Sequence, residues 1–437
     1  MSKGKVILAY SGGLDTSVIL KYLQEEGYEV ICFCANVGQD EDFDAVRKKA
    51  VALGASKVYV EDLREDFLIN YIYPAIKANA IYESRYLLGT SLARPCIAKR
   101  QVEVAHAEGA QFVGHGATGK GNDQVRFGLS VYALDPTIKE LAPWRDDKFL
   151  ARFRGRQDLL NYARAKGIPL PSGEKPPYSM DDNMMHISYE SGELEDPSRV
   201  AEESLYGKTG RWDQWADAPE VVRIHFSNGV PVRVELPASG ESHDQPLPMF
   251  QCLTRLGRKH GIGRVDIVED RYIGLKSRGV YETPAVTILR CAHIDIEGIA
   301  MDREVMRLRD MLSPEFSKLA YDGFWFSPEM DFLVSAINKS QELIDGWVDV
   351  RCYKGSCMAI ARQSPTSLYD EKLASMEEVD SFSPSDAGGF IRIQAIRLKA
   401  HREILKKVGK DRLASLLPEP TPTYAAFSEV GEHEADG

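Results

Sequence analysis

The stretch Val6-Ile-Leu-Ala-Tyr-Ser-Gly-Gly-Leu-Asp-Thr-Ser17 decides the fold. Its four apolar residues 6–9 are typical of a buried strand, and Ser11-Gly-Gly-Leu-Asp-Thr-Ser17 opens a helix that continues to residue 24. The two glycines permit a tight turn in which several backbone N–H groups point one way, and the helix dipole adds partial positive charge there. The hydroxyls of Ser11, Thr16 and Ser17 supply further donors. The stretch therefore predicts a turn that binds a polyanion.

Two other interpretations of this turn are weaker. A kinase-type phosphate loop needs the lysine of Gly-x-x-x-x-Gly-Lys-Ser/Thr, and residues 11–17 contain none. A purely structural glycine turn, capped by Ser or Asp, would account for the glycines. It would not account for so specific a heptapeptide directly after the first strand.

Short apolar runs alternate with helical patterns through the first 165 residues. We expect strands at residues 6–9, 30–34, 58–60, 112–113 and 138–142. We expect helices at residues 17–24, 43–53, 67–80, 92–107 and 125–133, with Gly27, Gly54 and Gly109 at helix ends. This alternation predicts an α/β fold with a doubly wound parallel sheet covered on both faces. Strands that are apolar throughout favour the same fold.

Prolines at residues 169, 171, 176 and 177 interrupt the pattern, so we place a domain boundary there. Residues 1–166 are expected to form a nucleotide-binding domain and residues 167–385 an α+β domain. The second domain should contain strands at 221–226, 232–236 and 265–268, and helices at 250–260, 301–312 and 332–348. An amphipathic helix at 389–408 predicts a C-terminal helical segment over 386–410, and the Pro-rich, then acidic residues 411–437 predict a disordered tail.

A second glycine-rich stretch, Gly114-His-Gly-Ala-Thr-Gly-Lys-Gly-Asn-Asp-Gln-Val-Arg126, follows a later strand. Residues 114–119 match Gly-x-Gly-x-x-Gly, but they follow the fourth strand and no helix begins directly after them, so a dinucleotide site is rejected. Residues 114–121 nearly spell a kinase-type loop, but Gly121 stands where Ser or Thr would bind magnesium. Gly207-Lys-Thr209 lacks the upstream glycine altogether.

The end of this stretch carries chemistry of its own. Asn122, Asp123 and Arg126 place a donor, a carboxylate and a guanidinium within five residues at a helix start. Such a group can bind a zwitterion, with Asp123 toward an ammonium and Thr118 and backbone N–H groups toward carboxylates. Asp123 as a simple helix cap is the alternative. His115 is expected to be structural rather than catalytic.

Composition narrows the class of protein. The 437 residues carry a formal net charge of −11, which disfavours broad nucleic-acid binding because that needs a basic surface. The seven cysteines show no Cys-x-x-Cys spacing, so neither a disulfide framework nor a zinc site is expected, and Cys32 and Cys34 should pack in the core. No apolar run is long enough to span a membrane or serve as a signal peptide, so we expect a cytoplasmic protein without membrane contact.

The turn at residues 11–17 resembles the PP-loop of adenine-nucleotide-binding ATP pyrophosphatases. Members of that superfamily hold the β,γ-pyrophosphate of ATP while the α-phosphorus is attacked. The resemblance implies that Ala35, near the end of the second strand, lies beside the adenine, with Gly38 and Gln39 in the turn that follows.

Over nearly its whole length the chain resembles the argininosuccinate synthase family. Six stretches carry the resemblance in this order: Ala9-Tyr-Ser-Gly-Gly-Leu-Asp-Thr-Ser17, Arg85-Tyr-Leu-Leu-Gly-Thr-Ser-Leu-Ala-Arg-Pro95, Gly116-Ala-Thr-Gly-Lys-Gly-Asn-Asp-Gln-Val-Arg-Phe127, Ser179-Met-Asp-Asp-Asn-Met-Met-His-Ile-Ser188, Asp266-Ile-Val-Glu269 and Lys276-Ser-Arg-Gly-Val-Tyr-Glu-Thr-Pro284. Residues 190–219 and those beyond 408 fit the family pattern least well.

The family resemblance implies a role for each matching residue. The ATP-binding residues would be Ala9, Tyr10, Ser11, Gly12, Gly13, Leu14, Asp15, Thr16, Ser17, Ala35 and Gly116. The citrulline-binding residues would be Tyr86, Ser91, Asn122, Arg126, Ser179, Ser188, Glu269 and Tyr281, and the aspartate-binding residues Thr118, Asn122 and Asp123. Val265, Ile267 and Glu269 share one strand face, so Glu269 should point from a sheet edge toward the substrate. Residues 167–385 would then be a synthetase and multimerisation domain, and residues 386–410 an arm that holds a homotetramer together, unless that helix packs on its own subunit.

The implied reaction joins citrulline to aspartate in two steps, through citrullyl-AMP, with release of pyrophosphate and then AMP. No covalent protein nucleophile is needed. Magnesium would bridge the phosphates without a protein ligand that the sequence identifies, although Asp15 is a candidate for orienting the turn. Asp123 or a substrate phosphate could accept the proton of the attacking amine. An adenylating amidotransferase, a tRNA-modifying thiolase and a non-catalytic scaffold are the rival classes, disfavoured by the Met-Ser-Lys start, the net charge and the intact Asp123, Arg126 and Glu269 respectively.

Overall fold

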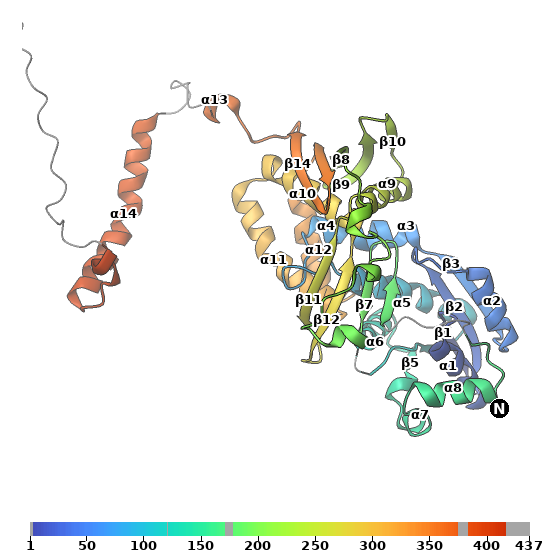
Figure 1. Ribbon diagram of the computed structural model, residues 1–437. Coiled ribbons are helices and arrows are strands. Elements are labelled where there is room, and N and C mark those ends of the chain that lie inside the picture. Colours follow the sequence, from blue (N-terminus) through green and yellow to red (C-terminus); the bar gives the residue numbers. More distant parts are fainter. Residues whose placement is uncertain (1–2, 120, 171–177, 375–382, 417–437) are drawn as a thin grey trace, which may run out of the picture. The chain divides into compact units, whose positions relative to one another are not determined.

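Five parallel strands organise the first third of the chain (Figure 1). The computed structural model describes residues 3–119, 121–170, 178–374 and 383–416, and the strand order is β3-β2-β1-β4-β5. These strands are β1 (Lys5–Ala9), β2 (Glu29–Asn36), β3 (Lys57–Asp62), β4 (Phe112–Gly114) and β5 (Lys139–Leu141). The predicted doubly wound parallel sheet is confirmed.

Two hydrophobic cores cover the two faces of this sheet. Val6 and Leu8 of β1 join a core with α1 (Leu14–Glu25), α2 (Phe43–Ala52), α7 (Asp147–Arg152) and α8 (Arg156–Ala165), and the buried Cys32 and Cys34 lie in it as predicted. Ile7 belongs to the other core, with α5 (Gly89–Glu108) and α6 (Asp123–Leu134). The strand order reverses between β1 and β4, so the helices that follow these strands lie on opposite faces. A crevice is thereby left at the carboxyl ends of β1 and β4, where α/β sheets bind ligands.

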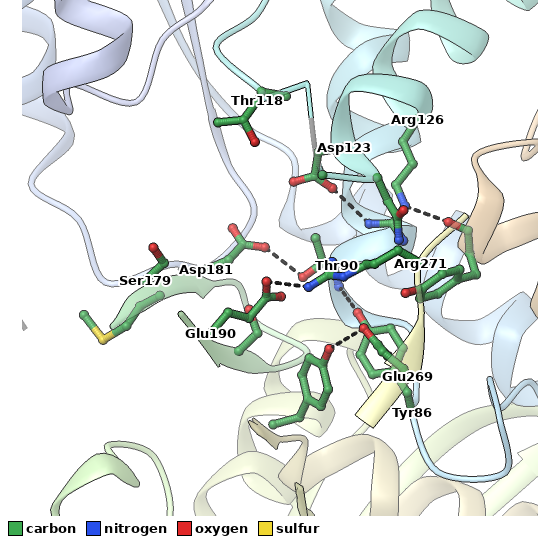
Figure 2. Close-up of a pocket in the computed structure, with 17 residues that line it drawn as sticks. Tyr86, Thr90, Thr118, Asp123, Arg126, Ser179, Asp181, Glu190, Glu269 and Arg271 are labelled. Atoms are coloured by element: carbon green, nitrogen blue, oxygen red, sulfur yellow. Dashed lines mark hydrogen bonds and ion pairs between the residues drawn. The ribbon is translucent and has the colours of Figure 1, made fainter. Parts of the chain in front are cut away.

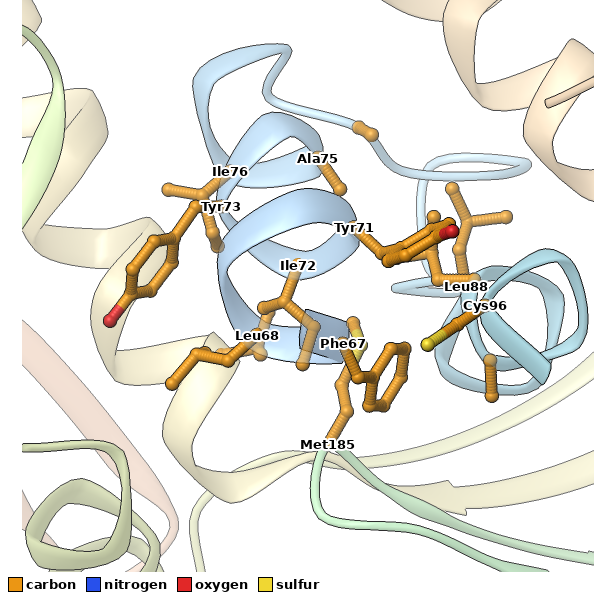
Figure 3. Close-up of a cluster of buried hydrophobic side chains, with 14 of the residues drawn as sticks. Phe67, Leu68, Tyr71, Ile72, Tyr73, Ala75, Ile76, Leu88, Cys96 and Met185 are labelled. Carbon is orange, nitrogen blue, oxygen red and sulfur yellow. The ribbon is translucent and has the colours of Figure 1, made fainter. Parts of the chain in front are cut away.

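The helix predicted at residues 67–80 begins earlier and ends earlier. It is built from α3 (Arg64–Phe67), a π-helical turn (Leu68–Ile72) and α4 (Tyr73–Lys77). Pro74 lies in the first turn of α4 and has no N–H to donate, which accounts for the widened turn before it. Figure 3 shows Phe67, Leu68, Ile72 and their neighbours in this segment packed together with Met185. The same core continues into the second half of the chain, so the segment joins the two halves.

Two antiparallel sheets follow. The first has the order β10-β9-β8-β13-β14 and the second the order β11-β12-β7-β6. Their strands are β6 (Ser179–Asp182), β7 (Ile187–Glu190), β8 (Glu220–Ser227), β9 (Val230–Leu236), β10 (Glu241–His243), β11 (Arg264–Asp270), β12 (Lys276–Glu282), β13 (Gly346–Tyr353) and β14 (Ser356–Gln363). The accompanying helices are α9 (Pro246–Lys259), α10 (Pro284–Ala300), α11 (Arg303–Asp322) and α12 (Pro328–Ser340).

The helix predicted at residues 332–348 is wrong in its second half. Helix α12 ends at Ser340, and β13 begins at Gly346, whose φ of +133° is not helical. Beyond it Val348, Val350 and Cys352 are buried and their neighbours are not, which is the period of a strand. The helix predicted at residues 301–312 begins at Arg303, capped by the Asp302 carboxylate, and runs on to Asp322. The elements that were not predicted include strands β6, β7, β10, β12 and β14 and helices α7, α8 and α10.

Residues up to Leu368 form one compact unit, and residues from Tyr369 form another. The second unit contains α13 (Glu371–Ala374) and α14 (Pro384–Lys407), where the amphipathic helix was predicted. Of the predicted tail, residues 412–416 form a short 3-10 helix and residues 417–437 lie outside the described residues, as does the stretch 171–177 at the predicted domain boundary. Within the described residues, every helix is too short or too polar to cross a membrane.

Candidate active site

The turn after β1 leaves backbone donors unused. Gly13 caps α1 without a side-chain hydrogen bond, and the first N–H groups of a helix have no partner inside it. The N–H groups of Leu14, Asp15 and Thr16 are therefore open to an anion. Gly12 has a φ of +73°, a conformation that favours glycine, and this turns the chain sharply into the helix.

Hydroxyl contacts brace this turn from within. Ser11 Oγ lies 3.2 Å from Thr16 Oγ1 and accepts a hydrogen bond from Gly13 N at 3.4 Å. Tyr10 is buried, and its hydroxyl lies 3.0 Å from Ser17 Oγ. Burial raises the pKa of Tyr10 to about 12, so its hydroxyl stays protonated and able to donate. The turn is thus a preformed cradle of donors.

The other residues of the implied ATP site lie near this turn. Ala35 is buried at the end of β2, the strand beside β1, and its carbonyl accepts a hydrogen bond from Gln39 Nε2 at 2.8 Å. Gly116 follows β4 on the other side of β1, and a Cβ there would lie 3.1 Å from Thr16 Cγ2. The structure therefore brings Gly116 against the phosphate turn.

A cavity of about 200 Å³ opens beside the second glycine-rich loop (Figure 2). Nine of the implied substrate residues line it, namely Tyr86, Thr118, Asn122, Asp123, Arg126, Ser179, Ser188, Glu269 and Tyr281. The other lining residues are Thr90, Ala117, Gly121, Met180, Asp181, Glu190, Arg271 and Tyr321. Of the residues implied to bind citrulline or aspartate, only Ser91 does not line it. Ser91 is buried in the first turn of α5, and its hydroxyl has no hydrogen-bond partner among the described residues.

Ion pairs between carboxylates and guanidinium groups follow one side of the cavity. Asp123, at the first position of α6, accepts hydrogen bonds from Arg126 Nη1 and Arg94 Nε, both at 2.9 Å. Burial by itself would raise the pKa of Asp123, but the two guanidinium charges outweigh it and hold that pKa at about 2. Arg94 Nη2 also lies 2.8 Å from Asp181. Asp123 is therefore a fixed carboxylate in an ion-pair network and does not cap the helix.

The cavity is also lined by a carboxylate, Glu269, that has an oxygen without a hydrogen-bond partner among the described residues. Glu269 is 1% exposed, and its Oε1 accepts a hydrogen bond from Tyr281 OH at 2.9 Å. Its Oε2 has no hydrogen-bond partner among the described residues, nor has Asn122 Nδ2. Burial raises the pKa of Glu269, a sign that its charge is incompletely compensated. Orphaned buried polar atoms in a cavity wall indicate a polar ligand, here one with a positive group for Glu269.

Several residues in or beside the cavity wall were not predicted from the sequence. Glu190 lies two residues after Ser188 on β7, so the period of the strand could have found it. Arg94 and Thr90 lie within one of the six family-like stretches. Arg271, which donates to Glu190 Oε2 at 2.6 Å, and Tyr321, on α11, carried no signal in the sequence because long-range packing brings them to the cavity.

The rejected motifs have structural roles. The N–H groups of Lys208 and Thr209 donate to the buried carboxylate of Glu282, at 3.1 Å and 2.6 Å. These backbone donors of the Gly-Lys-Thr stretch therefore bind a side chain of the protein itself. His115 is buried, stacks on Phe127 and lies 2.8 Å from Glu140, as expected for a structural histidine. Lys120 lies outside the described residues.

The site has two parts: a turn lined with hydrogen-bond donors, at the switch point of a parallel sheet, and a cavity with charges of both signs. Residues 116–118 join the turn to the cavity. Together these features define a nucleotide-dependent enzyme that acts on small zwitterions. Comparison with known proteins agrees with this class. The arginosuccinate synthase N-terminal HUP domain matches residues 5–169, and the arginosuccinate synthase C-terminal domain matches residues 178–401.

Full-length relatives give the same result. The chain is 56% identical to an argininosuccinate synthase of Thermotoga petrophila over 92% of this chain and 99% of the relative. It is 55% identical to one of Danio rerio (92% and 98%) and 53% identical to one of Rattus norvegicus (93% and 99%). The chain belongs to the argininosuccinate synthase family.

Proposed function

We propose that this chain catalyses the ATP-dependent ligation of L-citrulline and L-aspartate to argininosuccinate, releasing AMP and pyrophosphate. One observation carries the proposal most directly. A phosphate-binding turn and a cavity with charges of both signs adjoin each other through residues 116–118, where Gly116 meets the turn and Ala117 and Thr118 line the cavity. Such an arrangement can direct a group of a zwitterion onto a phosphorus of ATP.

In the first step the ureido oxygen of citrulline attacks the α-phosphorus of ATP. A phosphorus–oxygen bond forms, the bond to the bridging α,β-oxygen breaks, and pyrophosphate leaves with the electron pair. The N–H groups at the start of α1 are suited to stabilise the negative charge on that leaving group. No side-chain nucleophile takes part. We propose that Ala9, Tyr10, Ser11, Gly12, Gly13, Leu14, Asp15, Thr16, Ser17, Ala35 and Gly116 make up this ATP site.

Citrulline needs an anion for its ammonium, a cation for its carboxylate and hydrogen bonds for its neutral ureido group. The free oxygen of Glu269 suits the ammonium and Arg126 suits the carboxylate, and both residues line the cavity. Five further residues that line the cavity are proposed to complete the site, namely Tyr86, Asn122, Ser179, Ser188 and Tyr281. Ser91 is proposed to support it from behind, because it does not line the cavity.

In the second step the aspartate amine attacks the activated carbon and AMP leaves with the ureido oxygen. Thr118, Asn122 and Asp123 line the cavity next to the loop that touches the phosphate turn, which supports their proposed role in binding aspartate. Asp123 is a weak base, because its pKa is held at about 2. We therefore propose that Asp123 orients the amine and that an oxygen of the substrate phosphate accepts the proton.

Magnesium is proposed to accompany ATP, where it would neutralise phosphate charge. The phosphate turn offers one carboxylate of its own, Asp15, which suits an ion held mainly by phosphate oxygens and water. Among the described residues, Glu241, His243 and Cys252 are the grouping with metal-ligand spacing. Arg255 already donates to Cys252 Sγ at 3.6 Å and also to Glu241, so a cation is in place there.

The test of the reaction is product analysis with purified protein. ATP, citrulline and aspartate together should give AMP, pyrophosphate and argininosuccinate in equal amounts, and omission of either amino acid should stop argininosuccinate formation. Release of ADP, or turnover indifferent to citrulline and aspartate, would refute the proposal.

We propose further that the protein is a cytoplasmic homotetramer with the domain limits 1–166, 167–385, 386–410 and 411–437. The match boundaries at residues 169 and 178 support the first limit. Helix α14 presents exposed apolar side chains, among them Phe390, Ile393 and Ile396, which supports an assembling role. Light scattering of the chain ended at residue 383 should then show monomers or dimers, and an unchanged mass would assign α14 to its own subunit instead.

A further inference from the structure

Lys49 contacts the phosphate turn although the turn contains no lysine of its own. Its Nζ donates to the carbonyl oxygen of Gly12 at 2.7 Å. Lys49 lies on α2, three residues after Val46, and both side chains reach the turn from one face of that helix. Val46 packs directly beneath Gly12, where a Cβ would lie 3.0 Å from Val46 Cγ2.

The ammonium of Lys49 has no counterion among the residues that the structure describes. It is half-buried, and no carboxylate of the described residues forms an ion pair with it. Burial lowers the pKa of Lys49, and the more distant Glu41 offsets this only in part. A half-buried cation is costly without an anion nearby. A polyphosphate bound by the adjacent N–H groups of the turn would supply the anion that the Lys49 ammonium needs.

The hydrogen bond also fixes a peptide plane. In a trans peptide the C=O of Gly12 and the N–H of Gly13 point in opposite directions. Because Lys49 holds the Gly12 oxygen on the α2 side, the Gly13 N–H is directed away from α2, into the turn, where its present contact is a long one of 3.4 Å to Ser11 Oγ. Ser17 Oγ also donates to the Gly12 oxygen, but at 3.5 Å, so Lys49 makes the shorter of the two contacts that orient this peptide.

We propose that Lys49 is a positioning residue of the nucleotide site, which holds the Gly12–Gly13 peptide in its phosphate-binding orientation and supplies the positive charge that the turn itself lacks. Its ligand class is a polyphosphate, namely ATP before the reaction and pyrophosphate after it. The inference rests on the proposed function, in which this turn holds the leaving pyrophosphate.

The test compares Lys49→Met, Lys49→Gln and Lys49→Arg with Lys48→Met, which removes an exposed lysine from the same helix. Lys49→Met should raise the KM for ATP and the inhibition constant of pyrophosphate by about 10- to 150-fold, the range for loss of a charge-assisted hydrogen bond. The KM values for citrulline and aspartate should stay within about twofold. Lys49→Arg should recover most of the loss, and Lys48→Met should match the wild type.

Lys49→Gln separates charge from folding, because it keeps a donor for the Gly12 oxygen and should fold if Lys49→Met does not. Thermal unfolding of each variant checks the fold. An unchanged KM for ATP in Lys49→Gln, an equal rise for all three substrates, or no recovery in Lys49→Arg would overturn the proposal. Wild-type release of AMP and pyrophosphate tests the proposed reaction separately, whatever the variants do.

Discussion

Glu269→Gln separates substrate binding from stability more sharply than any other single change. The substitution keeps the shape of the side chain and leaves an oxygen to accept the Tyr281 hydroxyl, which lies 2.9 Å from Oε1. It replaces the unpartnered oxygen by an NH2 group, which cannot accept from an ammonium. A hydrogen bond to a charged group contributes about 1.5–3 kcal/mol. We therefore expect the KM for citrulline to rise by about 10- to 150-fold, with those for ATP and aspartate unchanged.

The same change should not destabilise the protein. The pKa of Glu269 is raised by burial, so its neutral form is the one that the fold favours. The stability that this form contributes is present below the ordinary glutamate pKa of about 4.3 and is lost as pH rises through the higher folded value. At neutral pH the glutamine variant should be at least as stable as the wild type, and this difference should shrink as the solution is acidified.

The assay is initial-rate release of AMP and pyrophosphate with citrulline varied, together with thermal unfolding of the substrate-free protein. Asp270→Asn is the matched control, because Asp270 is the next residue of β11, faces outward and pairs with Lys276 at 2.7 Å. A citrulline KM within about twofold of the wild type, or an equal rise in the control, would refute the role of Glu269.

Three further predictions follow from other parts of the structure. Asp123→Asn should raise the KM for aspartate by at least about tenfold. Because the pKa of Asp123 is held at about 2, the wild type should lose stability as pH falls from about 4 toward 2, and the Asn variant should not show this loss in thermal unfolding. Arg309→Met leaves the buried Glu297, now 2.7 Å from Arg309 Nη2, without its partner, so urea unfolding should show a loss of about 3–5 kcal/mol with unchanged KM values. Gly12→Ala forces a side chain into a φ of +73°, at a cost of about 1–2 kcal/mol, and should raise the KM for ATP about tenfold while that for citrulline stays constant.

Local signals in the sequence were sufficient for the parallel strands and most helices of the nucleotide domain, although helices α7 and α8 were not predicted. The strand at residues 6–9, its glycine turn and the helix after it were predicted because each is set by neighbouring residues. The boundary at Gly346 was missed because the apolar residues spaced among polar ones through 332–348 fit one helix as well as a helix followed by a strand.

The residues of the site likewise fall into those that the sequence predicted and those that only the structure revealed. Glu269 was placed correctly, at an edge strand and pointing inward, because the period of β11 fixes its direction. Arg271 lies just beyond that strand and Tyr321 on a helix 50 positions later, and only the tertiary packing brings them to the cavity. The role of Lys49 was likewise not predicted, because its contact with Gly12 joins helix α2 to the turn after β1, 37 residues earlier in the chain.

Transfer of an oxygen label tests the central claim most directly, namely that the phosphate turn directs citrulline onto the α-phosphorus of ATP. Citrulline that carries ¹⁸O in its ureido group should give AMP with one ¹⁸O atom and unlabelled pyrophosphate, because the attacking oxygen leaves with the AMP. Label in pyrophosphate, or AMP without label, would place the attack at another atom and contradict the account.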